Sequence, residues 1–511
     1  MKRMLALMML PLLLALTGCG QWEAPQDNLY DTLAPYFGTA DQEDPLPVLT
    51  SFALPYLDGE TADPITCSDG AQKTLGSLLY EGLFTLDPGF EPQPCLAESY
   101  SYDPASRTYT IALRQGVFFS DGTELTARDV VYSVNRARNS QRYGSRLADV
   151  SAVEGSGSTV TIRLRRDNAA FAARLDIPVI KYNTGSLTYP VGTGPYYYTQ
   201  EGGAAWLAVS ARWWQQKELP LKRIELVRCK DSDTMSYAFY SREIQLLMCD
   251  LTSTSTSNVY GSGTYTDAAT TTMQFIGINT ARAPLSDPAL RCALQLGIDR
   301  QGCIDAFFLG HGLAAQSPLS PASALYPAEL DVAYSPDNFD IAMTDAGYAR
   351  GETVELTLLV NQENSFKASA AQRIAQDLSV HDVHITVRQL PWEQYLLALQ
   401  LGDYDLYYGE CRLTADWDLQ SLVGTGGALN CGGYSSAETD QLLADCLRSP
   451  ESERQAAMLA LCRQLRQDAP ILPVCFKSAS VLLPSGAVES ITPTAANPFY
   501  DLPEWKVDIA Q

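Results

Sequence analysis

The stretch Tyr109-Thr-Ile-Ala-Leu-Arg-Gln-Gly-Val117, followed by Phe119-Ser-Asp-Gly-Thr123 and Leu125-Thr-Ala-Arg-Asp-Val-Val131, carries signals for a strand, a turn and a helix in that order. Apolar and polar residues alternate over 107–113, which predicts the strand. The Asp-Gly pair supplies the positive φ that a hairpin turn needs. Thr126 can cap a helix that helical spacing extends to about residue 137. We therefore expect this stretch to determine the fold rather than to contact a ligand.

Extended segments alternate with turns around this stretch, as at 158–164, and they predict a strand-rich unit. A short strand is expected within 46–54 and a helix over 74–86. The segment 252–272 is rich in Ser, Thr and Gly, so we expect a surface loop there.

A different pattern begins near Pro220, where strands and helices alternate. We expect a βαβ unit from strand 223–228, helix 233–243 and strand 244–248. The pattern returns with strands at 354–360, 384–389 and 404–408 and helices at 366–379 and 392–401. Such alternation predicts parallel sheets with right-handed crossovers. Two α/β regions on one chain predict two lobes with a cleft between them, which is a common place for a ligand.

Charge narrows the classes of partner. The chain has 36 Lys and Arg residues against 59 Asp and Glu residues, a net charge of −23 over 511 residues. An acidic protein of this kind repels phosphate backbones, so we expect no nucleic-acid partner. Length and apolar content are sufficient for more than one core, so we expect at least two domains.

The N-terminus resembles a bacterial lipoprotein leader. Lys2 and Arg3 precede an apolar run from Met4 to Leu16, which is shorter than the roughly 20 residues of a membrane-spanning helix. Leu-Thr-Gly-Cys ends at Cys19, so we expect a signal peptide over 1–18 and acylation of Cys19. Residues 20–47 are acidic and contain several prolines, which predicts that 19–47 form a flexible tether.

Twelve cysteines less Cys19 leave eleven, an odd number for an exported protein. The sequence contains no Cys-x-x-Cys pair. Cys229 and Cys249 end two apolar runs and could face each other at the ends of neighbouring strands, although the sequence does not fix that geometry. We expect most of the eleven to be reduced and buried.

Signals for an enzyme are weak. Only three histidines occur, and His381 and His384 precede a strand in which they would point to opposite faces. His311 lies between two glycines and is typical of a turn. The sequence shows no Gly-x-Ser-x-Gly elbow, phosphate loop or metal triad. We therefore expect no catalytic residue, metal or cofactor.

An ordered set of motifs resembles the extracellular solute-binding proteins of ABC importers, in the oligopeptide, dipeptide and nickel-binding family. The set starts with Tyr80-Glu-Gly-Leu83 and the opening stretch and continues through Gly192-Thr-Gly-Pro-Tyr196. It ends with Pro284-Leu-Ser-Asp-Pro288, Ala415-Asp416-Trp417 and Ala469-Pro-Ile-Leu-Pro473. The matches run from about Leu46 to the C-terminus. The chain departs from the family at Arg412-Leu413, where a Gly-Trp pair usually stands, and at Arg242-Glu-Ile-Gln245.

The resemblance implies an α/β, two-lobed periplasmic-binding-protein-like fold of type II, the Venus-flytrap arrangement, with an extra inserted domain in the first lobe. Its implied boundaries are 48–70 with 186–278 and 478–511 for lobe I, 71–185 for the inserted domain and 279–477 for lobe II. Hinge crossings are expected near Gly277–Thr280 and Lys477–Val481.

The function implied is that of a lipid-anchored substrate-binding protein, outside the cytoplasmic membrane or in the periplasm, that captures peptides and delivers them to an ABC permease and its ATPase. It would be a monomer without catalytic activity, and the membrane would be a partner only through the lipid anchor. The alternatives are the same fold binding a non-peptide solute or a signalling peptide and, more distantly, a secreted hydrolase.

The resemblance also implies a ligand site. Asp416 matches the family's acidic residue, so it is expected to pair with the free α-amino group of the ligand, where a buried unpaired charge would otherwise be costly. Thr414 and Arg412 are expected beside it, and Trp392 and Tyr408 are expected to wall the pocket.

Overall fold

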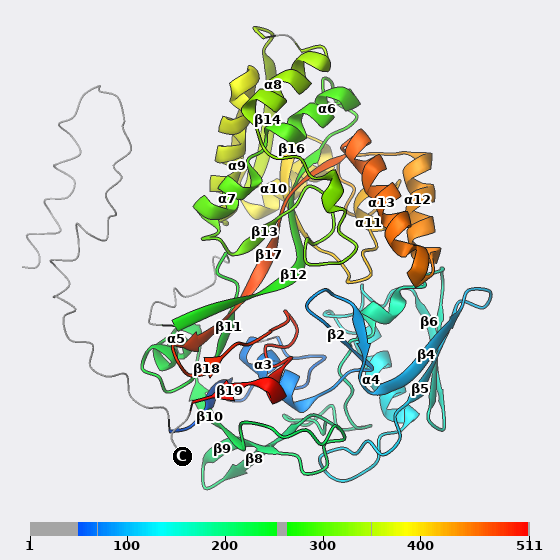
Figure 1. Ribbon diagram of the computed structural model, residues 1–511, viewed down its shortest axis with the longest axis vertical. Helices are drawn as coiled ribbons and strands as arrows, with labels where there is room; N and C mark the ends of the chain where they lie inside the picture. Colours follow the sequence, from blue (N-terminus) through cyan, green and yellow to red (C-terminus); the bar gives the residue numbers. More distant parts are fainter. Residues whose placement is uncertain (1–49, 69, 253–262, 349, 509–511) are drawn as a thin grey trace, which may run out of the picture. The chain divides into compact units, whose positions relative to one another are not determined.

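The computed structural model describes residues 50–508, except 69, 253–262 and 349 (Figure 1). The expected signal peptide, Cys19 and the tether lie outside the described residues. The described residues form mixed layers of helices and sheets, as the sequence predicts. Within the described part of the chain, no helix is both long and apolar enough to cross a bilayer.

The first sheet has four strands, in the order β1, β10, β9, β8, with β1 parallel to β10 and the other pairs antiparallel. Helix α3 packs on this sheet, and its core extends to residues near the C-terminus, such as Trp505. The elements are β1 (Ala53–Leu57), α3 (Gly70–Leu79), β8 (Tyr196–Glu201), β9 (Ala204–Val209), β10 (Arg223–Cys229) and α5 (Ser232–Tyr240).

A second four-stranded sheet, in the order β4, β5, β7, β6, is antiparallel throughout and is covered by helix α4. It contains the stretch quoted first, and its core is built from alternate strand residues such as Tyr109 and Ile111 with the buried face of the helix. Its elements are β4 (Ala97–Asp103), β5 (Thr108–Leu113), α4 (Ala127–Arg138), β6 (Val150–Ser156) and β7 (Thr159–Leu164), with the ribbon β2 (Phe84–Leu86) and β3 (Pro92–Pro94) alongside.

The third sheet has seven strands, in the order β11, β17, β12, β16, β14, β15, with β13 on β17. Strands β14, β15 and β16 are mutually parallel where they pair, as alternation predicts. The strands are β11 (Leu247–Cys249), β12 (Gly263–Ile278), β13 (Gly312–Ala314), β14 (Val354–Asn361), β15 (Val383–Leu390), β16 (Leu406–Arg412) and β17 (Ile471–Pro484). The short ribbon β18 (Val488–Glu489) and β19 (Lys506–Val507) follows.

Helices pack on this third sheet and build two further cores. They are α6 (Pro288–Leu294), α7 (Arg300–Phe307), α8 (Pro336–Asp345), α9 (Ser365–Leu378), α10 (Trp392–Leu401), α11 (Gln420–Val423), α12 (Ala437–Arg448) and α13 (Glu451–Asp468).

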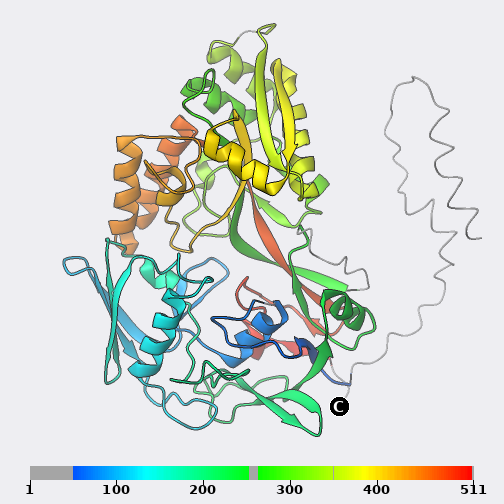
Figure 2. The same cartoon turned by 180° about the vertical axis from the view of Figure 1, so that it is seen from behind.

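Strands β12 and β17 are long neighbours that connect different parts of the third sheet (Figure 2). Near one end β17 pairs with β11, and at the other end β12 pairs with β16. Between these two regions the pairing of β12 with β17 shifts register between Ala269 and Met273, which marks a bulge.

Three expectations about elements are corrected. The helix expected over 74–86 ends at Leu79, because Gly82 lies against the backbone of Ile177, where a Cβ would be 3.0 Å from the carbonyl oxygen. The segment 263–272 is not a loop but the first part of β12, since pairing with β17 satisfies its polar backbone. The strands of the expected βαβ unit at 223–248 lie in different sheets, because β11 joins β17 rather than β10.

All eleven cysteines in the described residues are free, and seven are buried. Cys229 and Cys249 contribute to one small hydrophobic core and form no disulfide. Cys431 is exposed. His384 is exposed on β15, whereas His381 is buried at the end of a 3-10 turn (Ser379–His381) before that strand, so the two do not occupy opposite faces of one strand as expected.

Candidate functional site

A cavity of about 1510 Å³ lies in the described structure. Its walls come from segments far apart in the sequence, so the fold rather than any single motif creates it. They are the end of α3 with Tyr80 and Glu81, residues 142–149 after α4, Arg174, Trp213 and Trp214, Thr270–Thr272 of β12, the loops 412–418 and 425–429, and the C-terminal segment 493–503.

The loop after β16 forms one wall of this cavity. It turns at Trp417, which has φ of 55°, and the indole packs edge-on against Phe90 and Phe476 at centroid distances of 5.3 and 6.0 Å. Burial of this indole fixes the backbone on both sides of it. Arg412, the last residue of β16, and Thr414 of the loop both line the cavity.

Asp416 lies in the same loop but is not among the cavity-lining residues, and its side chain has no exposed surface. One oxygen, Oδ2, accepts hydrogen bonds from Arg174 Nε at 2.6 Å and Asn168 Nδ2 at 2.7 Å. Burial by itself would raise the pKa of Asp416, but the charge of Arg174 and the hydrogen bonds outweigh it and hold this pKa below its ordinary value. The other oxygen, Oδ1, accepts no hydrogen bond in the described structure.

Tyr408 and Trp392 do not line the cavity. Tyr408 lies within β16 with 1% of its surface exposed, and its hydroxyl donates to Gln274 Oε1 at 2.8 Å. Trp392 begins α10, is 49% exposed and stacks on Tyr395. Of the five residues expected to bind ligand, the structure therefore places Arg412 and Thr414 at the cavity, and the ligand roles of all five stay predictions.

Most arginines of the cavity are paired with carboxylates. Arg146 pairs with Asp176. Arg166 pairs with Asp149 at 2.7 Å and also with Asp418. Arg174 pairs with Asp416 at 2.6 Å and with Asp418 at 2.8 Å.

Arg142 and Arg412 differ from these. Arg142 donates to the carbonyl oxygen of Pro64 at 3.1 Å and lies 3.7 Å from the Cys67 sulfur. Within the described residues, no carboxylate forms an ion pair with Arg142 or Arg412. Water reaches the Arg412 side chain, although protein surrounds it on the cavity wall. Burial, followed by the nearby charge of Arg142, lowers the pKa of Arg412. Two like charges thus face one cavity in a strongly acidic protein.

Glu81 is the buried carboxylate of the cavity. It accepts hydrogen bonds from Trp213 Nε1 at 3.0 Å, Trp214 Nε1 at 2.9 Å and Thr193 Oγ1 at 2.9 Å, all neutral donors. Burial raises the pKa of Glu81, and these hydrogen bonds oppose the rise.

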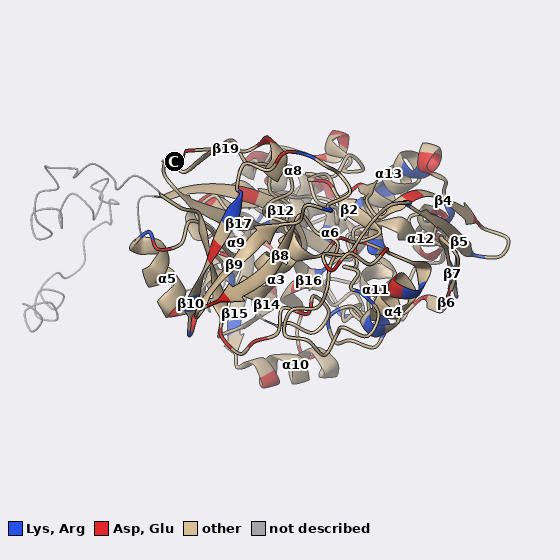
Figure 3. Cartoon of the chain, turned by 90° about the horizontal axis from the view of Figure 1, so that it is seen from below, with Lys and Arg blue, Asp and Glu red and all other residues tan. Residues whose placement is uncertain are grey.

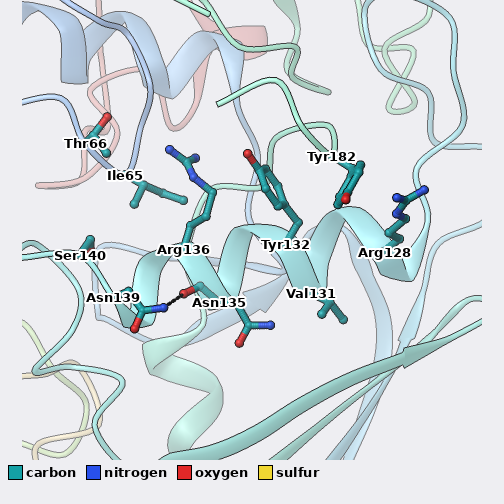
Figure 4. A pocket seen from close by; sticks show the side chains of 10 residues that line it. All are labelled: Ile65, Thr66, Arg128, Val131, Tyr132, Asn135, Arg136, Asn139, Ser140 and Tyr182. Carbon is teal, nitrogen blue, oxygen red and sulfur yellow. Dashed lines mark hydrogen bonds between the residues drawn. The ribbon is translucent and has the colours of Figure 1, made fainter. Parts of the chain in front are cut away.

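A second hollow of about 530 Å³ follows the outer face of α4 (Figure 4). The guanidinium of Arg128 lies 3.6 Å from the ring centroid of Tyr182, whose ring meets Tyr132 edge-on at 5.2 Å. Arg136 pairs with Asp63, and Asn139 donates to the Asn135 carbonyl. The charged and aromatic groups of this groove are therefore engaged with one another, unlike the arginine pair in the larger cavity.

Sequence reasoning missed Arg142, Arg174 and Glu81. Glu81 stands in the motif Tyr80-Glu-Gly-Leu83, which indicates the family but assigns no role to this carboxylate. A signal for Arg142 is present in the sequence, since Arg138, Arg142 and Arg146 recur every four residues in an acidic chain, whereas no such signal marks Arg174. Figure 3 shows Lys and Arg segments around α4.

A cavity that is lined by segments of separate sheets and by arginines without a carboxylate partner is typical of a ligand-binding protein. In the described residues, no group of His, Cys, Asp or Glu side chains could hold a metal ion.

Residues 91–423 match the family described as bacterial extracellular solute-binding proteins, family 5 Middle, and the chain belongs to this family. It is a substrate-binding protein of an ABC importer, works outside the cytoplasm and is not an enzyme. Proteins of this class bind a solute or peptide and interact with the importer's permease and ATPase.

The chain is 25% identical to the glutathione-binding protein GsiB of Escherichia coli (strain K12) over 445 residues, which cover 81% of this chain and 86% of GsiB. Two solved structures share its fold with TM-scores of 0.75. One is a nickel ABC transporter protein from Bacillus halodurans, 19% identical, covering 88% of this chain and 98% of that one. The other is the periplasmic murein tripeptide binding protein MppA in its unliganded open form, 17% identical, covering 90% and 98%. The expected type II fold is confirmed.

Proposed function

We propose that this protein captures peptides that carry an anionic group and delivers them to an ABC permease. The observation that carries the proposal is the pair Arg142 and Arg412, which face the cavity without a carboxylate partner in the described structure. Arginine binds a carboxylate through two parallel hydrogen bonds, and a bound anion relieves the repulsion between the two guanidinium groups.

The size of the cavity supports a peptide. Pockets for small molecules measure about 300–1,000 Å³, and this cavity of about 1510 Å³ leaves room for a chain of several atoms and water. The names of two relatives point the same way, since one is described as glutathione-binding and the other as murein tripeptide binding.

Closure on the ligand would use the bulge in β12 and β17 as the hinge. Lys477 stands there, buried, and pairs with Asp250 after β11 and with Glu410 of β16 at 3.8 Å, so carboxylates from both sides of the bulge meet one ammonium group. We place the bend here rather than at Gly277–Thr280, because Gly277 is paired on both sides and packs against the Tyr407 ring. The expected boundaries of the two lobes and the inserted domain remain part of this proposal.

The test of the arginine pair is calorimetry with glutathione and with trialanine. We expect Arg412→Gln and Arg142→Gln each to weaken binding by at least tenfold, because loss of one partner of a buried charge pair costs about 2–5 kcal/mol. Arg163→Gln is the matched control, since Arg163 is exposed and makes no side-chain contact with the cavity. Binding unchanged in both cavity variants would contradict an anionic ligand.

A non-peptide anion is the second candidate, because a guanidinium pair recognises a carboxylate whatever carries it. Native mass spectrometry of protein purified without denaturation distinguishes the two. A retained peptide supports the proposal, and a retained organic acid or metal chelate supports the alternative.

We also propose that Cys19 carries the lipid anchor. Two acyl chains hold a protein on a membrane stably, so Cys19→Ala should move the protein from the membrane fraction to the soluble fraction. A variant that stays with the membrane would show that another segment anchors it.

A further inference from the structure

We infer that Arg174 occupies the place of a ligand ammonium at Asp416, so that this protein selects ligands by an anionic group and not by a free α-amino group. The inference rests on the proposed function and deepens it. It assigns to Arg174 a role in specificity, and it differs from the amine-anchor role that the family resemblance implies for Asp416.

The geometry supplies the first argument. Arg174 Nε lies 2.6 Å from Asp416 Oδ2, and its Nη2 lies 2.8 Å from Asp418 Oδ2. The Arg174 side chain is only 4% exposed. One guanidinium thus bridges both carboxylates of the loop after β16, and Asn168 completes the contact with Asp416.

Charge balance supplies the second argument. Asp416 and Asp418 contribute two negative charges, and Arg174 and Arg166 contribute two positive charges that touch them. Arg166 also pairs with Asp149, so the cluster is not neutral as a whole, but the Asp416 carboxylate is already in contact with Arg174, which repels an arriving ammonium group at short range. Two guanidinium groups that line the cavity, those of Arg142 and Arg412, have no carboxylate partner in the described structure, which favours the negative end of a ligand beside them.

The ion pair between Arg174 and Asp416 persists over the whole physiological pH range, because the cation is an arginine. Its guanidinium remains protonated in proteins, so Arg174 cannot release Asp416 by losing a proton. A ligand amine would have to displace a buried, hydrogen-bonded cation and leave it without a partner, which is strongly unfavourable.

The first test compares trialanine with acetyl-trialanine, and glutathione with N-acetylglutathione, by calorimetry. In the wild type we expect each pair to bind within about threefold of each other. In Arg174→Gln, Asp416 loses its cation, and we expect the free amine to bind at least tenfold more tightly than the acetylated form. Arg163→Gln serves again as control and should behave as wild type. A wild type that loses tenfold or more on acetylation, with the preference abolished by Asp416→Asn, would overturn the inference.

The second test needs no ligand and separates this inference from the proposed function. A double-mutant cycle of Arg174→Gln and Asp416→Asn is measured on the ligand-free full chain by denaturant unfolding. We expect the unfolding equilibrium constant of the double variant to differ at least tenfold from the product of the single effects. Additive effects would show that the ion pair is not formed and would overturn the inference, even if peptides bind. Coupling together with failure of every peptide to bind would refute only the proposed function.

Discussion

At the scale of single residues, the site contains carboxylates in opposite situations. Asp416 is paired with an arginine and its pKa is lowered, whereas Glu81 is buried among neutral donors and its pKa is raised above the ordinary 4.5. Hydrogen bonds from neutral groups stabilise a buried carboxylate less than a cation does. Glu81 should therefore make the stability of the protein depend on pH.

The raised pKa of Glu81 predicts the direction in which the stability of the protein changes with pH. Its contribution to stability is fully present below about pH 4.5 and is lost as pH rises through the higher folded-state pKa. Glu81→Gln removes this titration. We expect the difference in melting temperature, wild type minus variant, to decrease as pH rises from about 4.5 toward neutrality. Glu98→Gln, an exposed carboxylate, is the control. A difference that does not vary with pH would contradict the assignment.

At the scale of elements, α4 begins with a capping arrangement that also holds a neighbouring segment. The Asp129 carboxylate accepts a hydrogen bond from the Thr126 amide at 2.9 Å, from the Thr126 hydroxyl at 2.6 Å and from the Tyr182 amide at 2.7 Å. Thr126 is the N-cap residue, as the sequence predicts, and Asp129 at position N3 completes a capping box by accepting from the Thr126 amide. The start of the helix and the chain at Tyr182 thus depend on one buried carboxylate.

Asp129→Ala should lower the free energy of unfolding by about 0.5–2 kcal/mol, since it removes the acceptor of the Thr126 and Tyr182 amides and with it the helix cap. Denaturant unfolding with unchanged m-value measures the loss. Glu124→Ala, which removes an exposed carboxylate in the preceding loop, should have less than about 0.5 kcal/mol effect. Equal losses in the two variants would argue against the cap.

The elements also show what sequence reasoning can and cannot supply. Helix 392–401 and the parallel strands after Thr353 were predictable, because local periodicity and burial agree there. Strand β12 was missed, because its residues 263–272 are polar and gain their structure from β17, some two hundred positions later. The same limit applies to the site: Arg412 was found from its motif, whereas Arg174 reaches Asp416 from 242 residues away.

At the scale of the whole molecule, the cavity and the bulged strands belong to one mechanism. The cavity has walls from segments on both sides of the bulge, since β11 and the C-terminal segment lie on one side and the loop after β16 on the other. Movement about the bulge would therefore bring cavity walls together, as hinge closure requires.

Small-angle scattering should record this closure as a smaller radius of gyration when glutathione or trialanine saturates the protein. Arg412→Gln at the same ligand concentration should show a smaller decrease in the radius of gyration, because it binds the ligand at least tenfold more weakly. A radius of gyration that is unchanged at full saturation of the wild type would rule out closure, whatever the affinity.

The single exposed thiol among the described residues gives the molecule a practical use. Cys431 follows the loop 425–429 that lines the cavity, while the other ten described cysteines are buried or partly covered. A maleimide dye that senses its surroundings would attach preferentially at Cys431, close in sequence to residues 425–429 of the cavity wall. The fluorescence of the labelled protein would then report solute binding, so candidate solutes could be screened without an engineered labelling position.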